Sequence, residues 1–348
     1  MSLKNPTSQG LPQGEPLAAF FGTPDRIERV FGQGRREQVL AAARAHGLGW
    51  LEGTVDTSRF EERKGEMERV QIIFSTWGMP ALSPTQIESM PNLKAIFYAA
   101  GSVQSFARPF LERGIKVVSA WAANGVPVAE WTLAMILLSN KGFWRNARAA
   151  SRPQTRAGAF SGRGNFGARI SILGVGQIGR HLIELLRPFE LQVLVFDPFL
   201  SDQAAHQLKA RKVSLEEAFA RGDVVSNHLA NLPATCQTLR GRHFNSMKEN
   251  ATFINTGRGA TVNEDEMIQI LRERPDLTAL LDVTDPEPPL ANSPLYELSN
   301  VQLSTHLAGS IGDEVVRMAD FMLQEFERWA RGEPLKYSVS PAMLETMA

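Results

Sequence analysis

One stretch, Ile170–Gly179, constrains the fold of this chain more than any other. It reads Ile-Ser-Ile-Leu-Gly-Val-Gly-Gln-Ile-Gly, an apolar run followed by three glycines. The apolar run predicts a buried strand, and glycines at this spacing predict a tight turn into a helix. Gly174 permits the turn, Gly176 lets the backbone approach a phosphate, and Gly179 allows close packing of helix on strand. The stretch therefore predicts an α/β domain with an anion site at a helix N-terminus, as in dinucleotide-binding proteins.

An acidic residue ends the next predicted strand. Asp197 closes the run Leu-Gln-Val-Leu-Val-Phe-Asp, 18 residues after Gly179. A carboxylate at about this distance accepts hydrogen bonds from the adenosine ribose of a bound dinucleotide. It would also repel the extra 2′-phosphate of NADP, and no arginine follows within the next six residues. We therefore expect NAD to be preferred over NADP.

The composition is that of an ordinary globular protein with about two domains. The chain has 348 residues, and Lys plus Arg equals Asp plus Glu at 37 each. This balance does not indicate nucleic acid or an anionic membrane, so a small-molecule partner is expected. No apolar run approaches the roughly 18 residues of a membrane span. The single cysteine, Cys236, is expected to be a buried apolar residue in a soluble, cytoplasmic protein.

Apolar runs alternate with helical patterns on both sides of the glycine turn, which predicts two α/β units. The expected strands are 17–21, 70–74, 95–98 and 117–119, then 193–196, 224–228, 251–255, 277–282 and 301–304. An apolar helix over 126–138 should link the units, and an amphipathic helix over 314–330 should return to the first. The predicted fold is two doubly wound parallel-sheet domains, 1–123 with 311–348 and 124–310, with a cleft between them.

The segment 141–169 carries the strongest charge asymmetry of the chain. No acidic residue lies between Glu130 and Glu184, whereas arginines are frequent there. The favoured interpretation is a solvated arm that docks on an acidic surface of a second subunit. The alternative is that Arg152 and Arg156 hold an anionic substrate.

Three segments after the glycine turn place ionisable side chains at predicted strand ends, which surround the ligand crevice of an open α/β sheet. Arg258 lies between two glycines, so its planar fork can turn toward a carboxylate. Glu287 lies between two prolines, which stiffen the loop that presents it. His306 follows the last predicted strand. Each segment alone is ambiguous, but the three together indicate acid–base chemistry beside a bound dinucleotide.

These motifs, in this order, resemble the D-isomer-specific 2-hydroxyacid dehydrogenase family over roughly residues 70–332. The resemblance implies a Rossmann NAD-binding domain and a smaller flavodoxin-like substrate domain, and it places the family's catalytic residues on Arg258, Glu287 and His306. It implies cofactor contacts from the glycine turn and from the strand ends at Gln177, Ile178, Asp197, His228, Thr256, Gly257, Asp282 and Gly309. It implies substrate contacts from Trp77, Gly101, Ser102 and Arg258, a homodimer, and no metal.

The residue types suit reduction of a 2-oxo acid, in which hydride reaches the carbonyl carbon and a proton reaches its oxygen. His306 is expected to be the general acid/base, because histidine titrates near neutrality. Glu287 is expected to stabilise its protonated form. Arg258 is expected to anchor the substrate carboxylate and to stabilise the charge that develops on the carbonyl oxygen.

Two other classes of protein share this architecture. Formate dehydrogenases are disfavoured, because they carry glutamine at the position that matches Glu287. An NAD-sensing binding module similar to transcriptional corepressors stays open, because its members retain a similar triad. The substrate also stays open among phosphoglycerate, glyoxylate, hydroxypyruvate and bulkier apolar 2-oxo acids.

Overall fold

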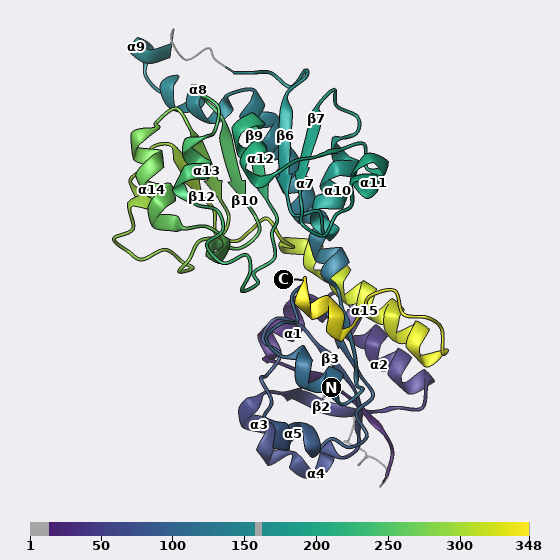
Figure 1. Ribbon diagram of the computed structural model, residues 1–348. Helices are drawn as coiled ribbons and strands as arrows, with labels where there is room; N and C mark the ends of the chain where they lie inside the picture. The colour runs from purple at the N-terminus through teal and green to yellow at the C-terminus, as the bar shows by residue number, and fades with distance from the viewer. Residues whose placement is uncertain (1–13, 157–161, 348) are drawn as a thin grey trace, which may run out of the picture. The chain divides into compact units, whose positions relative to one another are not determined.

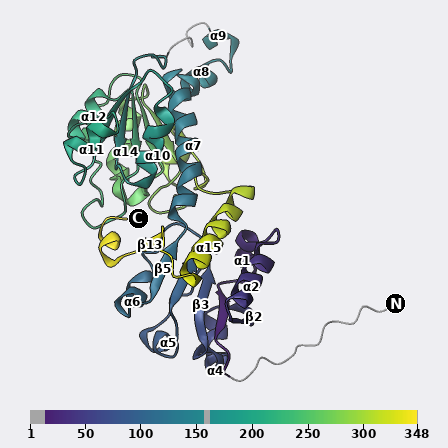
Figure 2. The same ribbon diagram turned by 90° about the vertical axis from the view of Figure 1, so that its right-hand side faces the viewer.

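The computed structural model describes residues 14–156 and 162–347. The chain divides into two compact units, Met1–Ala123 with Gly312–Leu344 and Asn124–Ile311 with Glu345–Ala348. Each unit has a mostly parallel sheet with helices on it (Figures 1 and 2). Ile311 and the last described residues, 345–347, belong to the second unit, whereas the sequence placed them with the first.

The sheet of the first unit has six strands in the order β13-β5-β4-β3-β1-β2. They are β1 (Leu17–Phe21), β2 (Gly49–Val55), β3 (Val70–Ser75), β4 (Ala95–Tyr98), β5 (Lys116–Ser119) and β13 (Ser338–Val339). All pairs are parallel except that of β13 with β5. The helices are α1 (Pro24–Phe31), α2 (Arg35–Ala45), α3 (Thr57–Glu62), α4 (Lys64–Met67), α5 (Pro84–Glu88), α6 (Ala107–Glu112) and α15 (Val315–Ala330).

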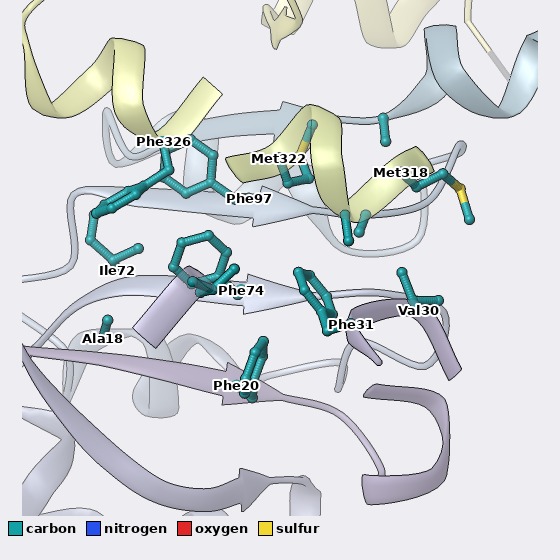
Figure 3. Packing of buried hydrophobic residues seen from close by; sticks show 14 of the residues in the cluster. Ala18, Phe20, Val30, Phe31, Ile72, Phe74, Phe97, Met318, Met322 and Phe326 are labelled. Atoms are coloured by element: carbon teal, nitrogen blue, oxygen red, sulfur yellow. The ribbon is translucent and has the colours of Figure 1, made fainter. Parts of the chain in front are cut away.

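Aromatic side chains fill the core between this sheet and the helices α1, α2 and α15 (Figure 3). Phe74 of β3 lies at the centre, with its ring 5.4 Å from that of Phe97 and 5.3 Å from that of Phe326 on α15. Phe31 of α1 packs on Phe20 of β1 at 4.9 Å. Large apolar area is thereby removed from water, which is the main source of stability for such a layer. Residues 312–344 thus complete the first unit.

The sheet of the second unit has seven strands in the order β12-β11-β10-β9-β6-β7-β8, all parallel. They are β6 (Arg169–Leu173), β7 (Gln192–Phe196), β8 (Arg211–Lys212), β9 (Val224–Asn227), β10 (Thr252–Asn255), β11 (Thr278–Leu281) and β12 (Val301–Leu303). The α-helices are α7 (Trp121–Asn140), which begins in the first unit, α8 (Phe143–Ala149), α9 (Pro153–Arg156), α10 (Gln177–Leu186), α11 (Asp202–Gln207), α12 (Leu215–Arg221), α13 (Gly241–Asn245) and α14 (Glu264–Glu273). The second unit also has the short 3-10 helices η2 (Gly259–Thr261) and η3 (Pro294–Tyr296), whereas η4 (Gly312–Glu314) and most of η5 (Pro341–Glu345) belong to the first unit.

Side chains of this sheet alternate between two cores, because successive residues of a strand point to opposite faces. Val225 of β9 and Phe253 of β10 belong to the core that contains residues of α12, α13 and α14. Their neighbours Val224 and Ile254 belong to the core that contains residues of α7 and α10. The sheet is therefore covered on both faces, and the prediction of a doubly wound α/β fold is confirmed.

Helix α7 is longer than the predicted 126–138 and includes Pro127. It has 20 residues, and by length and hydropathy it is the single helix among the described residues that could cross a membrane. Ala129, Thr132 and Ile136 are nevertheless fully buried, as in the core helix of a globular domain. The prediction for Cys236 was wrong, because its side chain is exposed.

Candidate active site

The carboxyl ends of the seven parallel strands lie at one edge of the second sheet, and most of the predicted site residues follow these ends. The strand order separates them into two groups. His306, Glu287 and Arg258 follow β12, β11 and β10, at one side of the sheet. The glycine turn and Asp197 follow β6 and β7 at the other side, and His228 follows β9 between the two groups.

The turn between β6 and α10 has the backbone that its glycines require. Gly174 has φ +86°, a conformation that favours glycine. A Cβ at Gly179 would collide with the carbonyl oxygen of Gly174, whereas a Cβ at Gly176 would meet no atom within 4 Å. Helix α10 has no side-chain cap at its N-terminus. The turn therefore presents backbone N–H groups with open space in front of Gly176.

Asp197 ties this turn to the end of β7. Its Oδ2 accepts a hydrogen bond from the Val175 N–H at 2.7 Å, and its Oδ1 accepts one from the Phe199 N–H at 2.8 Å. The carboxylate is thus held in place by its own chain. Each oxygen keeps a further lone pair that can accept a bond from a ligand hydroxyl.

His228 is held by hydroxyl groups on both ring nitrogens. Its Nε2 lies 2.8 Å from Ser226 Oγ, and its Nδ1 lies 3.0 Å from Thr256 Oγ1. Burial lowers the pKa of His228 to about 4, so the ring is neutral at pH 7. This histidine is therefore a fixed neutral group at the carboxyl edge of the second sheet, and it does not supply a charge.

The backbone of Arg258 is held by a network of buried polar side chains. Asn227 Nδ2 donates to Asn255 Oδ1 at 3.0 Å and to Thr261 Oγ1 at 2.9 Å, and Thr261 Oγ1 donates to the Arg258 carbonyl at 2.8 Å. The guanidinium itself bonds through Nη1 to the Gly257 carbonyl at 2.7 Å. Burial lowers the pKa of Arg258, and the charge of Glu287 opposes that shift. An arginine remains protonated in such a setting, so the site holds a partly desolvated cation.

His306 and Glu287 meet at the same edge. His306 Nδ1 lies 2.6 Å from Glu287 Oε1, and both side chains are accessible to solvent, at 46% and 39%. The loop that carries Glu287 packs closely on the segment that follows Arg258. A Cβ added at Gly259 would collide with the Thr284 carbonyl group. His306 Nε2 has no partner among the residues that the structure describes. The arrangement leaves this nitrogen available to exchange a proton with a ligand.

Asp282 braces the loop that carries the histidine. Its Oδ1 accepts hydrogen bonds from Ser304 Oγ at 2.7 Å and from the Leu307 N–H at 2.9 Å, and its Oδ2 accepts one from the Ala308 N–H at 3.0 Å. Gly309 follows in the same loop, next to Asn124, which accepts the Ser310 N–H at 3.1 Å. In this structure Asp282 is therefore satisfied by its own chain.

The remaining predicted residues belong to the first unit. Trp77 follows β3, and the guanidinium of Arg29 lies 5.4 Å from its ring centre. Gly101 and Ser102 follow β4, and the Gly101 carbonyl accepts a hydrogen bond from Ser119 Oγ at 2.6 Å. Thr76 Oγ1 donates to the Ala99 carbonyl at 2.8 Å and joins the two segments. These residues thus form one edge of the first sheet.

Several supporting residues were not predicted from the sequence. They are the buried polar residues Asn227, Asn255 and Thr261 and the hydroxyls Ser226 and Ser304. A signal was present for some of them, because Ser226-Asn227 and Asn255 end strands that are otherwise apolar. A buried polar group at such a position must find a partner, which predicts a network. In the described residues, no group of three or more His, Cys, Asp or Glu could hold a metal ion.

The sequence pattern described as "D-isomer specific 2-hydroxyacid dehydrogenase, NAD binding domain" matches residues 133–308, half of the chain. The chain belongs to this family. D-3-phosphoglycerate dehydrogenase of Archaeoglobus fulgidus is 26% identical over 260 residues, which is 74% of this chain and 49% of that protein. The chain spans about half the length of the curated relatives that it matches most strongly.

Several solved structures share the fold of this chain. Holo D-mandelate dehydrogenase of Rhodotorula graminis is 19% identical with a TM-score of 0.76, over 93% of this chain and 98% of that one. An acyclic imino acid reductase in complex with NADPH and D-Arg is 17% identical with a TM-score of 0.69, over 93% and 99% of the two chains. At these identities the likeness establishes the fold.

Proposed function

We propose that this chain is an NAD-dependent D-2-hydroxyacid dehydrogenase that reduces a 2-oxo acid and oxidises the corresponding hydroxy acid. The observation that carries the proposal is the contact of 2.6 Å between His306 Nδ1 and Glu287 Oε1, next to the cation of Arg258. A carboxylate beside an imidazole stabilises the imidazolium and orients the ring, which a proton donor needs.

The residues of the second unit fit a dinucleotide. The N–H groups at the start of α10 have no side-chain cap and would hold the pyrophosphate, while Asp197 would accept bonds from the ribose. The neutral His228, Thr256 and Gly257 would lie along the nicotinamide half. When bound, NAD accepts or supplies the hydride. We propose that Asp197 makes the chain prefer NAD over NADP, because its charge opposes a 2′-phosphate.

The chain's own residues would move the proton and hold the substrate. In reduction, His306 Nε2 gives a proton to the carbonyl oxygen while Nδ1 keeps its bond to Glu287. Arg258 has one guanidinium nitrogen on the Gly257 carbonyl, and Nε and Nη2 have no partner among the described residues. This free edge would bind the substrate carboxylate in a bidentate manner and would stabilise negative charge on the carbonyl oxygen. The reverse reaction uses the same groups, with His306 neutral at the start.

The test is NADH oxidation with a panel of 2-oxo acids by the wild-type chain, by His306→Ala and by His206→Ala. His206 is an exposed histidine of α11 and serves as the matched control. We expect His306→Ala to lower kcat by about 10²-fold or more and to leave the Kd of NADH within about twofold. Undiminished turnover in this variant would refute the assignment. Binding of NADH with no turnover of any 2-oxo acid would instead favour the corepressor-like module.

The panel includes 3-phosphonooxypyruvate, because three of the curated relatives that match most strongly are named D-3-phosphoglycerate dehydrogenases. Glyoxylate, hydroxypyruvate and a bulkier apolar 2-oxo acid complete it. We further propose that the first unit holds the substrate residues Trp77, Gly101 and Ser102, that the second unit holds the cofactor, and that the cytoplasmic protein is a homodimer. Sedimentation equilibrium tests the dimer, and a monomer mass would exclude it.

A further inference from the structure

A cavity of about 360 Å³ lies at the amino edge of the second sheet, opposite the edge that carries the candidate active site. Asp223, which directly precedes β9, and residues 248–251, which directly precede β10, line it. The end of α7, the start of α8 and residues 162–163 line it as well (Figures 1 and 2 show α8 at this edge). All lining residues belong to the second unit, and none of them is proposed to contact the cofactor or the substrate.

Two polar side chains of this cavity are buried and have atoms without a partner. Ser139 and Asn140, the last residues of α7, are 6% and 2% exposed. Asn140 Nδ2 donates to Asn165 Oδ1 at 3.0 Å, which holds the amide in place. Neither Ser139 Oγ nor Asn140 Oδ1 has a hydrogen-bond partner among the described residues. Because a buried polar atom without a partner costs about 1–3 kcal/mol, these two atoms point to a ligand that completes them.

Two cations of the cavity have free donors. Arg145 donates through Nη1 to the Asn250 carbonyl at 2.6 Å, and its Nε and Nη2 have no partner in the part of the chain that the structure describes. Burial lowers the pKa of Arg145, yet an arginine remains protonated in such a setting. Lys248 pairs with Asp223 and keeps two further N–H groups. The cavity therefore offers several charged donors on one side.

The acidic groups of the lining do not cancel this charge. Asp223 is paired with Lys248 through one oxygen, and Arg163 Nε lies 3.9 Å from the other. Glu249, the other acid of the lining, is exposed. With Arg145 included, the lining has three cations against two acids, a net charge of +1. Such a balance favours an anionic ligand.

We propose that this cavity binds a small oxyanion that also carries hydroxyl groups, either a polyol phosphate or a hydroxylated carboxylic acid. The free donors of Arg145 and Lys248 match the oxygens of a phosphate or a carboxylate. Ionised oxygens only accept hydrogen bonds, so they cannot satisfy Asn140 Oδ1, which needs a donor. A hydroxyl group supplies this donor and can also bond to Ser139 Oγ. The site goes beyond the proposed dehydrogenase function and does not depend on it.

Calorimetric titration of the full chain separates the two parts of the ligand. Glycerol 3-phosphate and 3,4-dihydroxybutanoate carry both the charge and the hydroxyls, methyl phosphate and butanoate carry the charge alone, and glycerol carries the hydroxyls alone. We expect at least one of the first two to bind about tenfold or more tightly than its matched plain anion, and glycerol to show no binding. The one that binds better tells phosphate from carboxylate. Neither is a 2-hydroxy acid, which keeps the probes distinct from the proposed substrates.

Three variants locate the ligand. Arg145→Gln should weaken binding of the better probe about tenfold or more, whereas Arg148→Gln, which changes an exposed arginine of the same helix, should alter it less than twofold. Ser139→Ala should weaken binding about threefold or more without lowering the melting temperature, because the hydroxyl that it removes has no partner in the free protein.

Four results would overturn the proposal. The first is that neither hydroxylated anion binds, and the second is that the matched plain anion binds equally well, since such a site makes no use of the hydroxyls. The third is unchanged affinity in Arg145→Gln or in Ser139→Ala. The fourth is loss of binding in Arg258→Gln, which would place the probe in the candidate active site. None of these measurements uses NADH oxidation, so failure of the proposed dehydrogenase function would leave them decisive.

Discussion

The backbone of His306 has φ +56°, a left-handed conformation that is unfavourable for residues with a Cβ. Four hydrogen bonds compensate for it. The His306 N–H donates to the Asp282 carbonyl at 3.0 Å, and the Asp282 carboxylate accepts from Ser304, Leu307 and Ala308. A loop tied at so many points fixes the direction of the imidazole, which is what proton transfer in a defined geometry requires.

Replacement of Glu287 by glutamine tests the charge while it keeps the shape of the side chain. We expect Glu287→Gln to lower kcat for reduction by about 10- to 100-fold, because a neutral amide stabilises the imidazolium less than a carboxylate does. Steady-state kinetics at pH 7 measure the effect. Glu297→Gln, an exposed glutamate of the same unit, is the control. Equal rates for both variants would mean that Glu287 has no part in proton transfer.

His228 predicts a pH dependence of stability. Its folded pKa of about 4 lies below the ordinary value of 6.5, so between these values the unfolded chain binds more protons than the folded one. The free energy of unfolding should therefore fall as the pH drops from 6.5 toward 4. We expect His228→Gln to show a loss smaller by about 1–3 kcal/mol over that range, measured by urea unfolding. His206→Gln is the control, and a pH slope unchanged by His228→Gln would contradict the expectation.

At the scale of elements, the glycine turn joins β6 to α10, and its glycines are required for different reasons. Gly179 lies inside α10 against the Gly174 carbonyl, and a side chain there would push the helix away from β6. Gly176, at the N-terminus of the same helix, faces open space. One glycine is therefore needed for packing, and the other leaves room for a ligand.

This difference predicts opposite results for two alanine substitutions. We expect Gly179→Ala to destabilise the protein by about 1–3 kcal/mol, because the new methyl group overpacks the turn. Gly176→Ala should keep the melting temperature within about 2 °C and weaken NADH binding about tenfold, because its Cβ would occupy the path of the pyrophosphate. Thermal unfolding and fluorescence titration separate the two effects. Unchanged NADH affinity in Gly176→Ala would remove the phosphates from this turn.

Most strands could be predicted from apolar runs, but β2, β8 and β13 could not. β2 (Gly49–Val55) contains two glycines, and β8 (Arg211–Lys212) has two charged residues at the edge of its sheet. β13 (Ser338–Val339) pairs antiparallel with β5. The glycines of β2 weaken its strand signal, and β8 and β13 are only two residues long. Such strands form because a neighbouring strand offers hydrogen bonds, and local sequence carries no signal of that. Helix α7 likewise began five residues earlier than predicted, since burial outweighs the cost of Asn124 and Gly125 within it.

At the scale of the whole molecule, each of the two units is stabilised by hydrophobic cores of its own. The core around Phe74 stabilises the first unit, and those around Phe253 and Ile254 stabilise the second. All residues proposed for the cofactor lie in the second unit. Ligand binding should therefore stabilise the units unequally.

Hydrogen exchange in the presence and absence of NADH tests this organisation. At about 100-fold its Kd, NADH should stabilise the second unit by about 2.7 kcal/mol and slow exchange in β6, β9 and β10. Amides of β3 and β4 should exchange at nearly unchanged rates. Phe74→Ala should destabilise the first unit by about 3–5 kcal/mol and leave the Kd of NADH unchanged. Equal protection of both units by NADH would show that they unfold together.

The sequence by itself determined the βαβ turn and the aspartate of the next strand, and it pointed to Arg258, Glu287 and His306 as candidate site residues, because these depend on residue type and spacing along the chain. Tertiary structure decided which of them touch. Parallel strand order brings Glu287 within 2.6 Å of His306, from which it is 19 positions away along the chain. The same order commits Asp282 to the backbone of the histidine loop. Such contacts depend on strand order and on close approach of backbones, which no local pattern encodes.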